Sequence, residues 1–182
     1  MEKQKIAVFF PGNFYPAKAP LFYYADLVLA RKGFRVIELS YDHISENEED
    51  WIQTAREQFL EQLRSEGIEN AGEIVFVSKS IGTVIAGWIS AQLEAESLPR
   101  VKNVFFSPLK GSLPFLASED CIVYAGTKDR LLDAGELKDF CEENRVRFKI
   151  FEGAGHAIVD RSDPEKSVRI LGEMVKGMEE YF

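Results

Sequence analysis

Short apolar runs, separated by stretches with a helical period, follow one another along the whole chain. Runs of this kind, rich in β-branched and aromatic residues, are typical of strands buried on both faces of a parallel sheet. We expect six strands, at Lys5 to Phe10, Phe34 to Ser40, Ile74 to Val77, Val101 to Phe106, Cys121 to Ala125 and Arg147 to Phe151.

The stretches between these strands carry helix signals. Pro20 suits the first position of a helix that Gly33 ends, and the spacing of Trp51, Ala55, Phe59 and Leu63 marks one buried helical face. Further helices are expected from the residue after Ser80 to about Glu96, from Asp133 to about Asn144, and from Pro164 onward. The last of these should line its apolar side with Val168, Leu171, Val175, Met178 and Phe182.

Strands that alternate with helices predict a single α/β domain spanning residues 1–182. Its architecture should have three layers, with a parallel six-stranded sheet and helices on both faces. Composition agrees, because 182 residues with 46% apolar side chains suffice for one sizeable core.

Charge narrows the range of partners. Lys and Arg total 22 against 30 Asp and Glu, a formal net charge of -8, which argues against nucleic-acid binding and against attraction to anionic membranes. The apolar run at Lys5 to Phe10 is too short for a signal-peptide core or a membrane span, so we expect a cytoplasmic protein. Cys121 and Cys141 have no metal-binding or redox spacing and are expected to be buried thiols.

The most informative stretch runs from Glu73 to Trp88 and reads as strand, tight turn, helix. In such a turn the central residue, Ser80, is held in a strained conformation that pushes its hydroxyl out above the sheet edge. The neighbours Ser78 and Gly82 are small enough to permit this. The alternative is an ordinary loop in which Ser78 or Ser80 helps to cap the following helix.

Two later loops belong to the same edge of the predicted sheet. Gly126 to Arg130, which contains Asp129, follows the fifth strand, and Glu152 to Ala157, which contains His156, follows the sixth. Because parallel strands place their carboxyl ends at one edge, we expect both loops to lie near Ser80. The alternatives are a turn-forming aspartate and a loop histidine with no catalytic task.

Together these loops resemble the α/β-hydrolase fold. Ser78 to Gly82 is similar to the G-x-S-x-G nucleophile elbow, with Ser78 in place of the first glycine, and Ser80, Asp129, His156 is the family's chain order. The resemblance is to small, lidless members that are dienelactone-hydrolase-like, but with a serine nucleophile. It implies no cofactor and no metal.

The resemblance implies a role for each residue. Ser80 would be the nucleophile, His156 the base and then the acid, and Asp129 the group that orients the imidazole. The backbone N–H groups of Ile81 and Asn13 would stabilise the oxyanion, with the N–H of Phe14 as the alternative to that of Asn13. Asp133 suits a helix cap better than the triad, His43 and Lys79 suit solvent-facing positions, and Phe106, Leu109, Phe115 and Leu116 are either pocket walls or core.

The sequence therefore predicts a serine hydrolase that cleaves a small ester, thioester or activated amide through an acyl-enzyme. Its partner is a small-molecule acyl substrate, whose identity the sequence leaves open along with the oligomeric state. Two alternatives remain: an acyltransferase with the same triad, and a non-catalytic binding or scaffold protein that keeps the fold.

Overall fold

The structure is a computed structural model that describes residues 3–41, 50–116 and 120–182. Its strands are β1 (Lys5–Phe10), β2 (Phe34–Glu38), β3 (Glu73–Lys79), β4 (Val101–Phe106), β5 (Cys121–Gly126) and β6 (Arg147–Phe151). Its α-helices are α1 (Pro20–Arg31), α2 (Trp51–Ser65), α3 (Ile81–Ala95), α4 (Ala134–Glu143) and α5 (Pro164–Tyr181), with short 3₁₀ turns η1 (Ile68–Asn70) and η2 (Lys110–Phe115). Among the described residues, no helix has the length and apolar character needed to cross a bilayer.

The six strands form one parallel sheet in the order β2-β1-β3-β4-β5-β6. The chain moves outward from β1 to β2, returns to β3, and then proceeds in the opposite direction to β6. The order therefore reverses between β1 and β3, and the loops after these two strands flank the crevice that this reversal creates. The predicted parallel six-stranded sheet with helices on both faces is confirmed.

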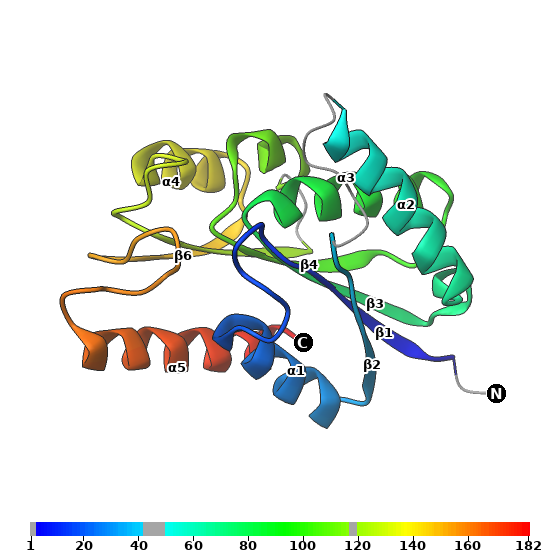
Figure 1. Cartoon of the computed structure of the whole chain (residues 1–182), viewed down its shortest axis with the longest axis horizontal. Helices are drawn as coiled ribbons and strands as arrows, with labels where there is room; N and C mark the ends of the chain where they lie inside the picture. Colours follow the sequence, from blue (N-terminus) through cyan, green and yellow to red (C-terminus); the bar gives the residue numbers. More distant parts are fainter. Residues whose placement is uncertain (1–2, 42–49, 117–119) are drawn as a thin grey trace.

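Alternate residues of each central strand face opposite layers of helices (Figure 1). Ala7 and Phe9 of β1 pack, with Val75 and Val77 of β3, against α1 and α5 on one face. The intervening residues of both strands pack against α2 and α3 on the other face. A third apolar cluster joins α4 to β4 and β5. Apolar residues on both faces explain why the central strands read as uninterrupted apolar runs.

The structure corrects two predictions, one about helix α5 and one about strand β2. The buried stripe of α5 consists of Ile170, Met174 and Met178, so the prediction that Val168 lies on it was wrong: that side chain is 70% exposed. The stripe repeats every four residues and is rotated from the predicted one. Strand β2 ends at Glu38, earlier than predicted. The expectation for His43 falls outside the described residues.

The helix after the elbow lies unusually close to the first strand. Gly82 is in the first turn of α3, and a Cβ atom built on it would lie 2.6 Å from the carbonyl oxygen of Pro11 and closer still to that of Phe10. Both oxygens are backbone atoms, which cannot swing aside as a side chain can. Glycine is therefore required here for steric reasons, although its φ is not in the left-handed region.

We predict that Gly82→Ala destabilises the protein by about 3 kcal/mol or more, since either β1 or α3 must move to admit the methyl group. Gly172→Ala in α5 is the matched control, because a Cβ there meets no atom within 4 Å. That control should raise stability by about 0.5–1 kcal/mol. Thermal or urea unfolding of both variants measures the effect, and similar stabilities would contradict the steric argument.

Candidate active site

Ser80 occupies a strained turn between β3 and α3. Its backbone angles are φ 55° and ψ -122°, a region that non-glycine residues seldom adopt. The turn is secured on both sides: Ser80 N donates to the carbonyl of Phe106 at 3.1 Å, and Thr83 N donates to the carbonyl of Ser80 at 2.9 Å. Ser78 is buried, with its hydroxyl donating to the carbonyl of Val104. Of these two serines, only Ser80 lines the pocket.

The loops after β5 and β6 are joined by several hydrogen bonds. Thr127 N donates to the carbonyl of Phe151, Lys128 N donates to the carbonyl of Ala154, and the Thr127 hydroxyl accepts from Gly153 N at 2.8 Å. This pairing holds the loop that carries Asp129 against the loop that carries His156. The two side chains thus owe their proximity to backbone contacts that continue the β5–β6 pairing.

Ser80, His156 and Asp129 form one hydrogen-bonded chain. His156 Nε2 lies 2.8 Å from Ser80 Oγ, and His156 Nδ1 lies 2.7 Å from Asp129 Oδ2. The Asp129 side chain is only 2% exposed and the His156 side chain is 30% exposed, so the chain runs from the interior toward solvent. The structure brings together the three side chains that the sequence singled out.

The charge state of Asp129 determines the direction of these hydrogen bonds. Burial alone would raise the pKa of Asp129, but hydrogen bonds from His156 and from Leu131 N, together with the charge of Lys79, outweigh it and lower the pKa. An ionised carboxylate only accepts, so Nδ1 of His156 donates to it. In the neutral ring Nε2 is then unprotonated and accepts from the Ser80 hydroxyl.

Asp133 does not belong to this chain. Its Oδ1 accepts hydrogen bonds from Gly135 N at 2.9 Å and Glu136 N at 3.0 Å, which caps the amino end of α4. The carboxylate thereby satisfies two backbone donors that the helix leaves without partners. The prediction that Asp133 is a helix cap is confirmed.

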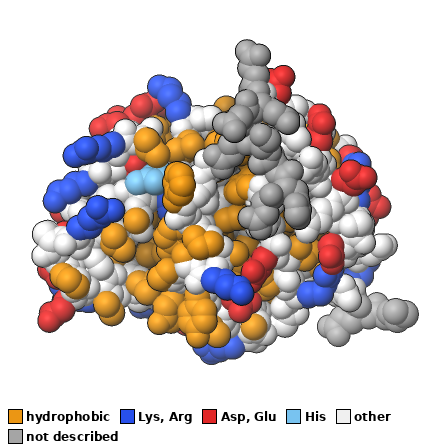
Figure 2. All heavy atoms as spheres, in the orientation of Figure 1, with side chains coloured by type: hydrophobic (Ala, Val, Ile, Leu, Met, Phe, Trp, Pro, Cys, Tyr) orange, Lys and Arg blue, Asp and Glu red, His pale blue; other side chains and the backbone are white. Residues whose placement is uncertain are grey.

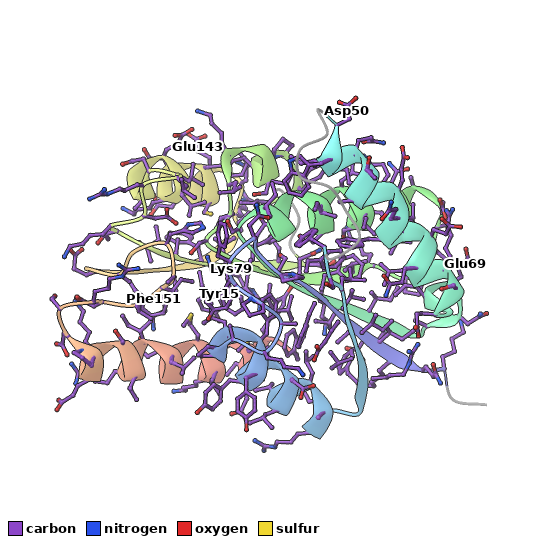
Figure 3. The ribbon with its side chains drawn as sticks, viewed as in Figure 1. Tyr15, Asp50, Glu69, Lys79, Glu143 and Phe151 are labelled. Carbon is purple, nitrogen blue, oxygen red and sulfur yellow. The ribbon has the colours of Figure 1, made fainter. Side chains whose placement is uncertain are left out.

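Lys79 is buried beneath the site, so the prediction of a solvent-facing lysine was wrong. The residue is 1% exposed, its ammonium donates to the backbone carbonyl of His156 at 2.7 Å, and Nζ lies 5.6 Å from the centre of the Tyr15 ring. Figure 3 labels Lys79 and Tyr15 beside each other at this end of the sheet. The Ser107 hydroxyl donates to the same His156 carbonyl at 2.8 Å, so two donors hold the histidine's backbone.

The loop after β1 passes directly beside Ser80. A Cβ on Gly12 would lie 3.2 Å from both Ser80 Cβ and the Lys79 carbonyl oxygen, a tight contact that the loop could accept only with a small shift. The loop is braced by two backbone hydrogen bonds between Gly12 and Tyr15, and by the Tyr41 hydroxyl, which donates to the Pro11 carbonyl at 2.9 Å. Pro11 is thus anchored by a residue that follows β2.

A pocket of about 930 Å³ opens at this edge of the sheet, near the upper end of the range for small-ligand sites. Ser80, His156, Asn13 and Ile81 all line it. Of the four apolar residues considered as walls, Leu109 alone contributes; Phe106 and Leu116 are core residues, and Phe115 packs against Gly87. The remaining lining residues are Gly12, Phe14, Tyr15, Trp51, Lys79, Lys128, Arg130, Leu131, Gly153, Gly155, Ala157, Val159, Asp160, Arg161 and Ser162.

The arrangement of these residues offers nucleophilic and acid–base groups. In the part of the chain that the structure describes, no cluster of His, Cys, Asp and Glu side chains has the composition to hold a metal ion. Cys121 and Cys141 are buried and, within the same residues, not disulfide-bonded, and burial raises the pKa of the Cys141 thiol to about 11. Neither thiol lines the pocket.

Comparison with solved structures agrees on the fold. A lidless α/β serine hydrolase from Xanthomonas campestris is 15% identical and superposes with a TM-score of 0.67 over 100% of this chain and 82% of its own. An esterase from Pyrococcus furiosus is 14% identical, with a TM-score of 0.64 and coverage of 97% and 84%. Est1E from Butyrivibrio proteoclasticus is 10% identical, with a TM-score of 0.67 and coverage of 100% and 88%.

No protein-family model matches the sequence, and no curated protein sequence matches it either. The structural similarity nevertheless extends over nearly the whole chain at TM-scores well above chance. The chain therefore has the α/β-hydrolase fold in a compact form, with six parallel strands.

The buried ammonium of Lys79 leads to a prediction about stability and pH. Burial lowers the pKa of Lys79 to about 8 from the ordinary 10.5, with the charge of Asp129 opposing the shift. Below pH 8 the lysine is charged in both the folded and the unfolded state, and folding then carries a desolvation cost of about 3 kcal/mol. Between pH 8 and 10.5 the folded protein has released the proton while the unfolded chain still binds it, so stability rises with pH.

We expect Lys79→Met to raise the melting temperature at pH 7 and to have a smaller effect at pH 10. The exposed Lys128→Met is the control for loss of one charge and should change the melting temperature little at either pH. The burial cost would be contradicted if the substitution raised the melting temperature less at pH 7 than at pH 10.

Proposed function

We propose that this protein is a serine hydrolase that cleaves an ester, thioester or activated amide through an acyl-enzyme. The observation that carries the proposal is the unbroken hydrogen-bonded chain from Ser80 through His156 to the buried Asp129. The Ser80 end of this chain lines the pocket. A serine hydroxyl becomes a competent nucleophile when an oriented imidazole removes its proton. Neighbours with the same fold, named as serine hydrolases and esterases, support this general class.

Acylation would begin with the attack of Ser80 Oγ on the substrate's carbonyl carbon. The hydroxyl proton passes to His156 Nε2, and the resulting imidazolium is stabilised by the Asp129 carboxylate. The carbonyl oxygen gains negative charge and is stabilised by the N–H groups of Ile81 and Asn13. Ile81 is the first residue of α3, whose leading N–H groups have no acceptor within the helix and whose dipole favours an anion.

Collapse of the tetrahedral intermediate completes the first half-reaction. The bond between the carbonyl carbon and the leaving oxygen, sulfur or nitrogen breaks, and the leaving atom takes the proton from His156 Nε2. Water then attacks the ester formed with Ser80: His156 removes a proton from the water, and returns it to Ser80 Oγ when the acid departs. The reaction balances with water as the only co-substrate, and no redox or metal step is needed.

The assignment of Ser80 is tested by two serine variants. Ser80→Ala should abolish both ester turnover and covalent labelling by a fluorophosphonate probe, with an unchanged unfolding temperature. Ser78→Ala should keep both activities, because its hydroxyl is buried on the Val104 carbonyl. Mass spectrometry locates the labelled residue. Labelling that persists in Ser80→Ala would contradict the mechanism, and an unlabelled parent protein would favour a binding or scaffold function.

The assignment of Asp129 is tested against the neighbouring cap. Asp129→Asn should reduce turnover by about 10⁴-fold, the loss seen when a serine protease's orienting acid becomes an amide, because the wrong imidazole tautomer is then favoured. Asp133→Asn should keep most of the turnover and lower stability by about 1 kcal/mol or less. Initial rates and thermal unfolding of both variants measure this. The opposite pattern would move the orienting acid to Asp133.

A further inference from the structure

Positive charge gathers around the pocket although the protein as a whole is acidic. Five charged residues line the pocket, and four of them are cations, whereas the chain has 22 Lys and Arg against 30 Asp and Glu. Figure 2 shows Lys and Arg groups near the pale-blue histidine. The excess of positive charge is therefore local to the pocket and is opposite in sign to the net charge of the chain.

Three of these cations form no ion pair with a carboxylate among residues 3–41, 50–116 and 120–182. Lys128, Arg130 and Arg161 are exposed, and within the described residues none of the three forms an ion pair. The one acidic residue in the lining is already engaged: Asp160 accepts from Lys166 Nζ at 2.9 Å and from Ser162, and these contacts lower its pKa. The fourth cation, Lys79, lies inside the protein near Asp129.

The three exposed cations lie on the leaving-group side of the proposed reaction. Lys128 and Arg130 flank Asp129 in the loop after β5, and Arg161 follows His156 in the loop after β6. The atom that leaves must receive its proton from His156 Nε2, so the leaving group has to lie beside these loops. The proposed oxyanion donors come from the opposite side, from the loop after β1 and the start of α3.

We propose that the substrate's leaving group, an alcohol or thiol, carries an anionic group such as a carboxylate or a phosphate, which Lys128, Arg130 and Arg161 attract. The inference rests on the proposed hydrolase function and adds the substrate class. Arg130 and Arg161 present planar donors that match both oxyanions. Leu131 and Val159 are exposed apolar side chains that line the pocket, and they would pack against the remainder of the leaving group.

The test compares substrates that differ only in the charge of the leaving group. Para-acetoxybenzoate and para-acetoxybenzamide share an acetyl group and a phenol, and the first carries a carboxylate where the second is neutral. We expect kcat/KM to be about tenfold higher for the anionic ester at low ionic strength. The difference should come from a lower KM for the anionic ester, with kcat similar for the two esters. Raising the salt from about 0.02 M to about 0.5 M should largely abolish the preference, because the rim charges are exposed.

A triple variant tests whether the rim is responsible. Lys128→Gln, Arg130→Gln and Arg161→Gln together should bring kcat/KM for the anionic ester to within about twofold of the neutral one, with neutral-ester turnover retained. The matched control removes three exposed cations outside the pocket, with Lys138→Gln, Arg169→Gln and Lys176→Gln. This control should keep the preference, which separates the rim from net charge.

Two further substrate pairs locate the charge and name its source. Para-nitrophenyl glutarate against para-nitrophenyl pentanoate moves the carboxylate to the acyl side, and there no preference is expected. The acetyl ester of para-hydroxyphenyl phosphate replaces the carboxylate by a phosphate, and the better of the two anions identifies the headgroup. An equal kcat/KM for charged and neutral leaving groups, or a preference confined to the acyl pair, overturns the proposal. If the parent protein turns over none of these esters, the hydrolase function itself is overturned.

Discussion

The close approach of α3 to the end of β1 is the constraint on which the rest of the site depends. Only a residue without a side chain at Gly82 lets the helix begin within contact of the Phe10 and Pro11 carbonyls. That approach brings the helix's first N–H groups and Ser80 to the sheet edge, beside the loop that contains Gly12. The strain at Ser80 is a consequence, because the chain must reverse within one residue to pass from strand into helix.

The site also contains a buried electrostatic network that extends beyond the hydrogen-bonded chain of Ser80, His156 and Asp129. Asp129 is negative and Lys79 positive, and each opposes the other's desolvation penalty. Lys79 connects to this chain through a backbone atom, the His156 carbonyl oxygen, to which the Ser107 hydroxyl also donates. Ser107 itself has a left-handed φ of 44°, so the loop after β4 is bent to reach that carbonyl. Because burying the Lys79 ammonium costs stability, we infer that this residue serves to position His156 and not to stabilise the fold.

Local patterns carried most of the fold prediction. Strands buried on both faces read as apolar runs, and caps such as Asp133 are visible as residue types at fixed offsets, so elements and their order were predictable. Ser80, Asp129 and His156 could be placed at one edge because parallel strands share an edge. Lys79 was misplaced because a charged residue ordinarily faces water; the one available signal was its position at the end of a strand buried on both faces. The prediction that Val168 lies on the buried face of α5 was wrong for another reason: an apolar residue on a helix can remain exposed to solvent.

Net charge was the weakest guide to what the pocket binds. A formal charge of -8 describes the far field, which argues against polyanionic partners such as nucleic acids. Within roughly one Debye length, about 8–10 Å at physiological salt, the nearest unneutralised groups dominate instead. At the pocket these are the cations beside His156, whereas some carboxylates elsewhere, such as Glu73 with Lys5 and Glu66 with Arg35, are engaged in ion pairs. The proposed preference for a small anionic leaving group would therefore be a property of the pocket, which the composition of the whole chain does not reveal.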